Sequence, residues 1–188
     1  MQTKQTISTR KIVFTALMAA LVAVGSALRV TLPMDIGGNT SFHLGNIFCA
    51  LSGILLGPWL GGAAAGLGSA IYDMMNPAYI AECWLTFLMK GAYGVATGLV
   101  IGFGKKEWGY PRATFATVAG AAVYAALYLL KSYLKPMIVR GFTSEAAMLA
   151  VIGKIPATVF NAVVAIVLAP VLAVAIRKAL EKNRLTLN

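Results

Sequence analysis

Six apolar stretches, separated by short polar segments, follow one another along the chain. They cover residues 12–32, 44–56, 59–75, 83–103, 113–133 and 155–176. A transmembrane helix needs about 17–25 apolar residues, and every stretch except the second meets that length. Only Gly57-Pro58 separates the second stretch from the third, so these two form either a tight helical hairpin or one bent element. The pattern predicts an all-α integral membrane protein whose six transmembrane helices form a single unit over residues 1–188.

Composition supports a membrane protein. The chain is 59% hydrophobic and 12% charged, whereas a soluble domain is about 45–50% apolar and about 25% charged. The net charge of +10 does not indicate a nucleic-acid partner, because the basic residues lie at the ends of apolar stretches, where they suit membrane lipid. The basic N-terminus and Ala-rich first stretch would also suit a signal peptide, but we expect a first span. Cys49 and Cys83 are expected to be small buried apolar side chains.

Basic residues are distributed unevenly between the two faces of this six-span arrangement. Ten flank the face that carries both termini, five belong to the other face, and Lys90 lies within a span. Because lysine and arginine favour the cytoplasmic side, we expect a cell-membrane protein with both termini in the cytoplasm. The outer loops are then residues 33–43, 76–82 and 135–153.

Charged residues within or beside the apolar stretches indicate a binding site. Arg29, Lys90, Lys131 and Lys154 occupy such positions, and a charge at membrane depth costs about 2.5–3.5 kcal/mol even on a lenient scale. Residues three, four or seven apart share a helix face. Three polar or aromatic stripes follow from that spacing, and they comprise Thr86, Lys90, Tyr93 and Thr97; Tyr124, Tyr128, Lys131 and Lys135; and Lys154, Thr158 and Asn161.

The three stripes predict one pocket near the outer face, in which tyrosine rings stack on a flat ligand and lysine or asparagine binds its polar edge. Asn39 and His43, at the end of the first outer loop, and Trp84, at the start of the fourth stretch, complete the candidate substrate-binding residues. The candidates drawn from the stripes are Lys90, Tyr93, Tyr124, Tyr128, Lys131 and Asn161.

Simpler interpretations of these residues remain open. Lys131, Lys135 and Lys154 would also be explained by snorkelling to the interface, and the two tyrosines of the fifth stretch by an aromatic belt. A purely structural Lys90 would need an acidic partner, with Asp73 and Glu82 the nearest by topology.

No catalytic or nucleotide-binding motif accompanies these residues. The sequence contains no GxxxxGK[ST], HExxH or GxSxG motif and has a single histidine. We therefore expect no enzyme activity and no ATP binding by a P-loop, and we predict no metal site and no cofactor.

Small residues recur at helical spacing on two stretches. Ala16 and Ala20 form one row, Ala19, Ala23 and Ala27 a second, and the glycines that begin with Gly57 a third. Such rows let another backbone approach closely. For the glycines we expect packing within the chain; for the alanines an external partner is an equal alternative.

The order of these features resembles a known family. The basic N-terminus, Ala-rich first stretch, FHLGN, LSGILLGPWLGGAAAGLGSAIYDMMNPAY and ECWLTFLMKGAYG look like the substrate-binding S components of energy-coupling factor (ECF) vitamin transporters. The resemblance covers about residues 10–178 and is closest to the branch of riboflavin, hydroxymethylpyrimidine and pyridoxine carriers.

The resemblance implies a fold of six helices, a vitamin held by the fourth to sixth helices beneath the first outer loop, a transmembrane T subunit and two cytoplasmic ATPases. An AxxxA pattern docks the family's first helix on the T subunit, and Ala16, Ala19, Ala20 and Ala23 occupy matching places. Pyridoxine-like or hydroxymethylpyrimidine-like substrates are favoured, with riboflavin next. A membrane enzyme or accessory subunit acting on lipid, and a small carrier without an ATPase, are the alternatives.

Overall fold

The computed structural model describes residues 8–32, 40–103 and 108–183, and five helices in these ranges are long and apolar enough to cross a membrane. They are α1 (Thr9–Ala27), α2 (Gly45–Met74), α3 (Cys83–Gly102), α4 (Tyr110–Arg140) and α5 (Ser144–Lys182). A short 3₁₀ helix, η1 (Ile80–Glu82), precedes α3, and two strands, β1 (Arg29–Leu32) and β2 (Thr40–His43), lie between α1 and α2. The predicted all-α membrane class is confirmed, although the predicted count of six helices is slightly off.

The count differs because the second and third apolar stretches form one assigned helix, α2, that reverses direction at Gly57. Gly57 has φ 77° and ψ −172°, a conformation that glycine adopts most readily, and Pro58 follows it. In a straight helix, residues nine apart are about 13.5 Å apart. The Ser52 hydroxyl nevertheless donates a hydrogen bond to the Gly61 carbonyl oxygen at 2.9 Å. Of the two alternatives, the structure therefore shows the helical hairpin.

The ends of three predicted stretches also change. The first was expected to stay helical to residue 32, but α1 ends at Ala27, and β1 pairs antiparallel with β2 from Arg29↔His43 to Leu32↔Thr40. The expected outer loop over residues 135–153 is mostly helical, because α4 continues to Arg140 and α5 begins at Ser144. Gly141, in the left-handed conformation at φ 65°, ends α4, and the Thr143 hydroxyl caps α5.

Small side chains fill the interior, and large apolar side chains cover the outside. Thirteen of the 22 buried apolar side chains among the described residues are alanines. Trp59, Phe103 and Ile138 are each more than three-quarters exposed. Large apolar groups on the outside and small ones at helix contacts are the arrangement expected of helices surrounded by lipid.

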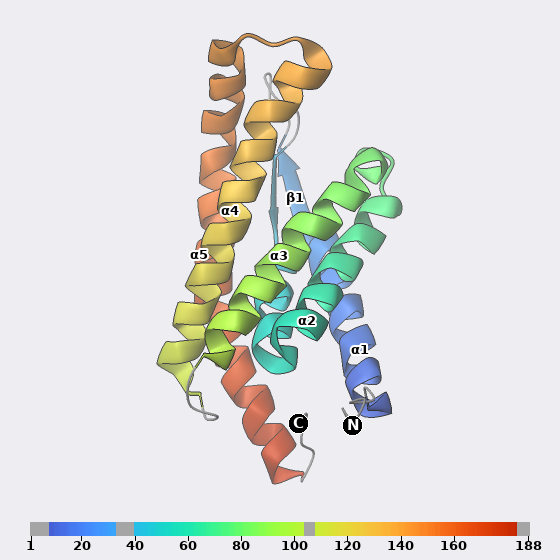
Figure 1. Ribbon diagram of the computed structural model, residues 1–188, viewed down its shortest axis with the longest axis vertical. Coiled ribbons are helices and arrows are strands. Elements are labelled where there is room, and N and C mark those ends of the chain that lie inside the picture. Colours follow the sequence, from blue (N-terminus) through green and yellow to red (C-terminus); the bar gives the residue numbers. More distant parts are fainter. Residues whose placement is uncertain (1–7, 33–39, 104–107, 184–188) are drawn as a thin grey trace, which may run out of the picture.

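The helices run lengthwise, and α1 begins at the same end of the molecule at which α5 ends (Figure 1). The α4–α5 connection and the turn between α2 and η1 lie at the opposite end, which we name the α4–α5 end. The strand pair lies among the helices and reaches toward that end.

The alanines of α1 face two directions. Ala16 and Ala20 are exposed, whereas Ala19 is buried and Ala23 is half-buried. A Cβ atom at Gly68 would lie 2.2 Å from the Ala19 carbonyl oxygen, so α1 packs closely on the second limb of α2 through Ala19. Of the four predicted docking residues, Ala16 and Ala20 lie on a free face of the described structure, and Ala19 packs inside the chain.

Candidate functional site

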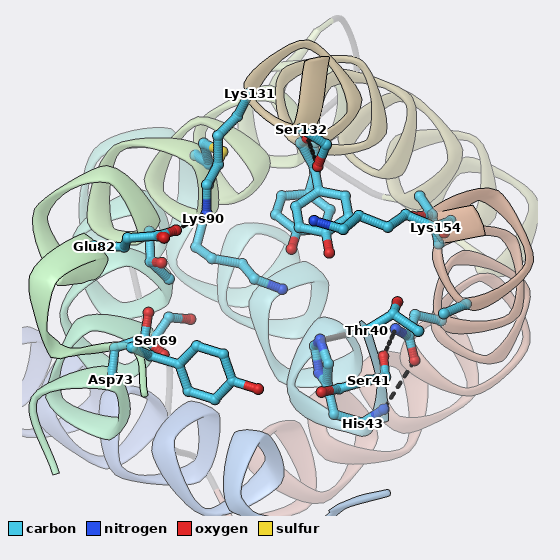
Figure 2. Close-up of a pocket in the computed structure, with 18 of the residues that line it drawn as sticks. Thr40, Ser41, His43, Ser69, Asp73, Glu82, Lys90, Lys131, Ser132 and Lys154 are labelled. Atoms are coloured by element: carbon cyan, nitrogen blue, oxygen red, sulfur yellow. Dashed lines mark hydrogen bonds and ion pairs between the residues drawn. The ribbon is translucent and has the colours of Figure 1, made fainter. Parts of the chain in front are cut away.

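A cavity of about 420 Å³ lies toward the α4–α5 end, enclosed by the strand pair, the second limb of α2, and helices η1, α3, α4 and α5 (Figure 2). This volume falls within the range of about 300–1,000 Å³ that is typical of small-molecule sites. Polar and charged side chains provide most of its wall, although the helices around it are apolar.

Asn161 of α5 holds β2 at the edge of the cavity. Its side-chain oxygen accepts a hydrogen bond from the backbone N–H of His43 at 2.9 Å, and its side-chain nitrogen donates to the Ser41 carbonyl oxygen at 2.8 Å. Asn161 is buried, so these two bonds satisfy much of an amide that would otherwise be costly to bury. The predicted binding residue Asn161 thus lines the cavity and also positions the strand beside it.

Lys90 of α3 extends into the cavity from a buried position. Its amino group donates a hydrogen bond to the Asn46 side-chain oxygen and lies 3.9 Å from the centroid of the Tyr124 ring. Neither Asp73 nor Glu82, the acidic partners considered from sequence, forms an ion pair with it. The amide and the ring face therefore stabilise the ammonium.

Stacked tyrosine rings form one wall of the cavity, and the stack continues behind that wall. Tyr124 and Tyr128, one turn apart on α4, have ring centroids 5.8 Å apart at 22°, and Tyr93 of α3 stacks on Tyr124 at 5.9 Å and 21°. Tyr124 and Tyr128 line the cavity, whereas Tyr93 is fully buried behind Tyr124 and does not. The wall presents aromatic side chains to a flat ligand.

Charged side chains form the part of the cavity wall that lies near the α4–α5 end. Glu82 makes ion pairs with both Lys131 and Lys135 of α4. Lys154 of α5 is buried, with its amino group 5.8 Å from the centroid of the Tyr128 ring. Lys131 is therefore part of a network within the protein as well as part of the cavity wall, and simple snorkelling does not describe it.

Arg29 lies at the base of β1, on the side of α1 and α2. Its guanidinium carbon is 4.2 Å from the centroid of the Tyr72 ring and 4.9 Å from that of Tyr79, and its Nε donates to the Ser26 carbonyl oxygen at 2.8 Å. These contacts hold a positive charge beside the cavity.

His43 of β2 lines the cavity as a neutral side chain. Its Nδ1 accepts a hydrogen bond from the Gly45 N–H at 3.2 Å, which leaves the proton of the neutral ring on Nε2. Burial, together with the positive charges of Lys90 and Arg29, holds the pKa of His43 well below its usual value. The imidazole is therefore a hydrogen-bonding group and not a further positive charge.

The structure brings six of the nine sequence-predicted binding residues to one cavity. They are His43, Lys90, Tyr124, Tyr128, Lys131 and Asn161. Tyr93 lies behind the wall, and Trp84 is 62% exposed on the outside of α3 and does not line the cavity. Asn39 lies outside the described residues.

Sequence reasoning left out several lining residues. Arg29 and Lys154 carried a signal, a charge beside an apolar stretch, but were not included among the site residues. Asp73 and Glu82 were considered only as partners of Lys90. Thr40, Ser41 and Ser69 gave no signal, because a short hydroxyl side chain in an apolar protein is usually explained by a backbone hydrogen bond.

Comparison with known proteins gives the family. The model of the ECF-type riboflavin transporter S component matches residues 6–178. An uncharacterised protein of Pyrococcus woesei is 31% identical over 114 residues, which are 61% of this chain and 72% of that protein. A UPF0397 protein of Lactiplantibacillus plantarum is 34% identical over 99 residues, 53% of this chain and 51% of that protein. The chain thus spans about half the length of the latter relative.

The family match covers nearly the whole chain, and the helical membrane fold with its enclosed polar cavity agrees with it. A lipid-directed membrane enzyme is therefore not retained as an alternative. The chain belongs to the ECF-type riboflavin transporter S-component family and is a substrate-binding subunit of a transporter, not an enzyme.

Proposed function

We propose that this subunit captures a small heteroaromatic vitamin or vitamin precursor for an ATP-driven ECF importer. The observation that carries the proposal is the tyrosine wall beside cations: Tyr124 and Tyr128 offer aromatic side chains, and buried Lys90 and half-buried Lys131 offer hydrogen-bond donors within the same cavity. Such a site binds a flat ring by stacking and selects its polar edge by charge-assisted hydrogen bonds.

Three substrate types are candidates. The sequence resemblance favours pyridoxine-like and hydroxymethylpyrimidine-like compounds, and the description of the matching family names riboflavin. A cavity of about 420 Å³ is compatible with a ligand of any of these sizes. Asn39, outside the described residues, remains a proposed ligand contact, whereas Trp84 and Tyr93 do not line this cavity and are not proposed as contacts.

The importer would also contain a transmembrane T subunit and two cytoplasmic ATPases. Exposed Ala16 and Ala20 support a docking face on α1, because small residues let a partner helix approach. The excess of basic residues beside the termini supports a cell-membrane protein whose termini are cytoplasmic and whose cavity faces outward.

The test is ligand binding without ATP. The purified full chain in lipid nanodiscs is titrated calorimetrically with riboflavin, pyridoxine, hydroxymethylpyrimidine, their 5′-phosphates or phosphate esters, and other B vitamins. We expect saturable binding of at least one heteroaromatic compound. We also expect that mass spectrometry of the purified protein will identify the same compound. The Tyr124→Ala variant should lose stacking contacts and bind at least tenfold more weakly, whereas Tyr110→Ala, on the same helix outside the cavity, should bind normally.

Absence of binding by every heteroaromatic compound would refute the proposed substrate class. Uptake that proceeds in cells lacking the T subunit and both ATPases would instead identify an independent small carrier, the remaining alternative.

A further inference from the structure

Positive charge predominates in the cavity. Six basic side chains line it against two acidic ones, a formal net charge of +4 with His43 neutral. The basic side chains are those of Arg29, Lys90, Lys131, Lys135, Arg140 and Lys154, and the acidic ones are those of Asp73 and Glu82. Because Glu82 is already shared by Lys131 and Lys135, it is not available to balance the others.

Two of these cations are buried without a carboxylate partner among the described residues. Lys90 is 4% and Lys154 is 9% exposed, and neither forms an ion pair there. Among the described residues, Lys90 contacts the Asn46 amide and the Tyr124 ring, and the Lys154 amino group lies farther, 5.8 Å, from the centroid of the Tyr128 ring. A buried ammonium without a counterion is strongly unfavourable, so its retention on two separate helices needs an explanation.

The two amino groups point into the same space. Figure 2 shows Lys90 and Lys154 extending from different walls toward the middle of the cavity. They lie over neighbouring rings of the stacked pair Tyr124 and Tyr128. A ligand that stacks on this pair would therefore bring its substituents within reach of both amino groups.

We propose that the substrate carries an anionic group, a carboxylate or a phosphate ester, which binds between Lys90 and Lys154. This inference rests on the proposed function, because it assigns the charge of the same substrate. The ligand anion supplies the missing counter-charge beside two buried ammonium groups, where charge-assisted hydrogen bonds are stronger than in water. Asp73 lies on a different wall of the cavity from Lys154, and its carboxyl group disfavours an orientation of the ligand in which the anion lies beside Asp73.

Matched neutral and anionic compounds test the charge. The full chain in nanodiscs is titrated with nicotinamide against nicotinate, pyridoxine against pyridoxine 5′-phosphate, and riboflavin against riboflavin 5′-phosphate. Pantothenate and inorganic phosphate serve as anions without an aromatic ring. We expect the anionic member of at least one pair to bind at least tenfold more tightly, and the pair that responds shows whether the anion is a carboxylate or a phosphate.

Substitution of the two lysines tests the position of the anion. Lys90→Met and Lys154→Met keep the aliphatic stem, and each should weaken binding of the preferred anion by 10–100-fold and binding of its neutral counterpart by a clearly smaller factor. Lys154→Arg should retain the preference. Lys178→Met is the matched control, because Lys178 is exposed on α5 and outside this cavity. Thermal melting and gel filtration establish that each variant is folded.

The outcomes separate this inference from the proposed function. Neutral members that bind as tightly as anionic ones, or folded lysine variants that weaken both members equally, overturn the anion site and leave a heteroaromatic substrate intact. Binding of pantothenate or phosphate alone overturns the heteroaromatic substrate and supports the anion site. No binding by any compound overturns both. The comparison of pairs on the unmodified chain decides the charge even if a lysine variant does not fold.

Discussion

At the scale of single residues, the partners of the buried cations are the most informative contacts. A purely structural Lys90 would have needed an acidic partner, but the structure provides the Asn46 amide and the Tyr124 ring face. Glu82 instead pairs with Lys131 and Lys135. Which side chains meet between helices depends on how each helix is rotated about its axis, and spacing along one helix does not specify that rotation.

Acidification should destabilise the protein through His43. Its pKa is held well below the usual value by burial and by nearby Lys90 and Arg29, whereas in the unfolded chain it is about 6.5. Below that pH the unfolded state binds a proton that the folded state excludes, so the stabilising contribution of neutral His43 is complete above pH 6.5 and falls as the pH drops. His43→Asn retains an acceptor for the Gly45 N–H and removes the titration. Between pH 7 and pH 5, the Tm of the unmodified protein should therefore fall more than that of His43→Asn; equal falls would show that His43 is not a source of the pH dependence.

At the scale of elements, α1 has an inward and an outward row of small residues. Replacing Ala16 or Ala20 with Trp places a large side chain on the exposed face, so we expect ATP-driven uptake and co-purification of the T subunit to fall at least tenfold while ligand affinity stays within threefold. Vesicle uptake and calorimetry on the same variants measure the two quantities.

Ala19→Trp is the matched substitution on the opposite row. Ala19 packs against the second limb of α2 at Gly68, so this variant should lower the Tm and reduce ligand binding together with uptake. If Ala16→Trp and Ala20→Trp behave in the same way as Ala19→Trp, the exposed row is not a docking face.

The contact between α3 and the α2 hairpin has no room for a methyl group at one position. A Cβ atom at Gly98 would lie 2.4 Å from the Pro58 backbone nitrogen and 2.5 Å from the Gly57 carbonyl carbon. Gly98→Ala should therefore destabilise the protein by about 1–3 kcal/mol, measured as a lower Tm or a lower unfolding midpoint in denaturant.

Gly91→Ala, on the same helix, is the control for Gly98→Ala. A Cβ atom there meets only the Gly62 carbonyl oxygen at 3.6 Å, an ordinary contact, and alanine favours a helix over glycine by about 0.5–1 kcal/mol. Gly91→Ala should leave the Tm unchanged or raise it. Equal losses in the two variants would mean that helix flexibility, not close packing, explains both glycines.

At the scale of the whole molecule, the reversal in α2 places the start of α1 and the end of α5 at one end (Figure 1). With the proposed orientation, a cysteine at Lys178 should react with a membrane-impermeant maleimide only after cells are permeabilised, whereas one at Glu145 should react in intact cells. Both positions are exposed and lie at opposite ends of α5. Labelling is compared with the parent chain, which contains Cys49 and Cys83. The reverse labelling pattern would invert the orientation, and labelling of both positions in intact cells would contradict this topology.

Much of the architecture followed from the sequence. Long apolar stretches separated by charges indicate membrane helices because each unpaired backbone group is costly in lipid, and Gly57-Pro58 marked the place where the chain reverses. Spacing along α4 aligned Tyr124, Tyr128 and Lys131, since residues three, four and seven apart share a helix face. These features are local, so the order of residues is enough to predict them.

Other features needed the tertiary structure because they depend on contacts between distant segments. Asn161, about 120 residues away in the sequence, binds the backbone of Ser41 and His43 and so holds the strand pair against α5. Tyr93 shares a stripe with Lys90, yet Tyr124 lies between it and the cavity, and Trp84 faces outward. Similarly, Lys154 differs from a snorkelling lysine only because α4 and α5 together enclose it. Sequence alone determined the membrane fold and the polar helix faces; the relative rotation and packing of the helices decided which of those residues form one cavity.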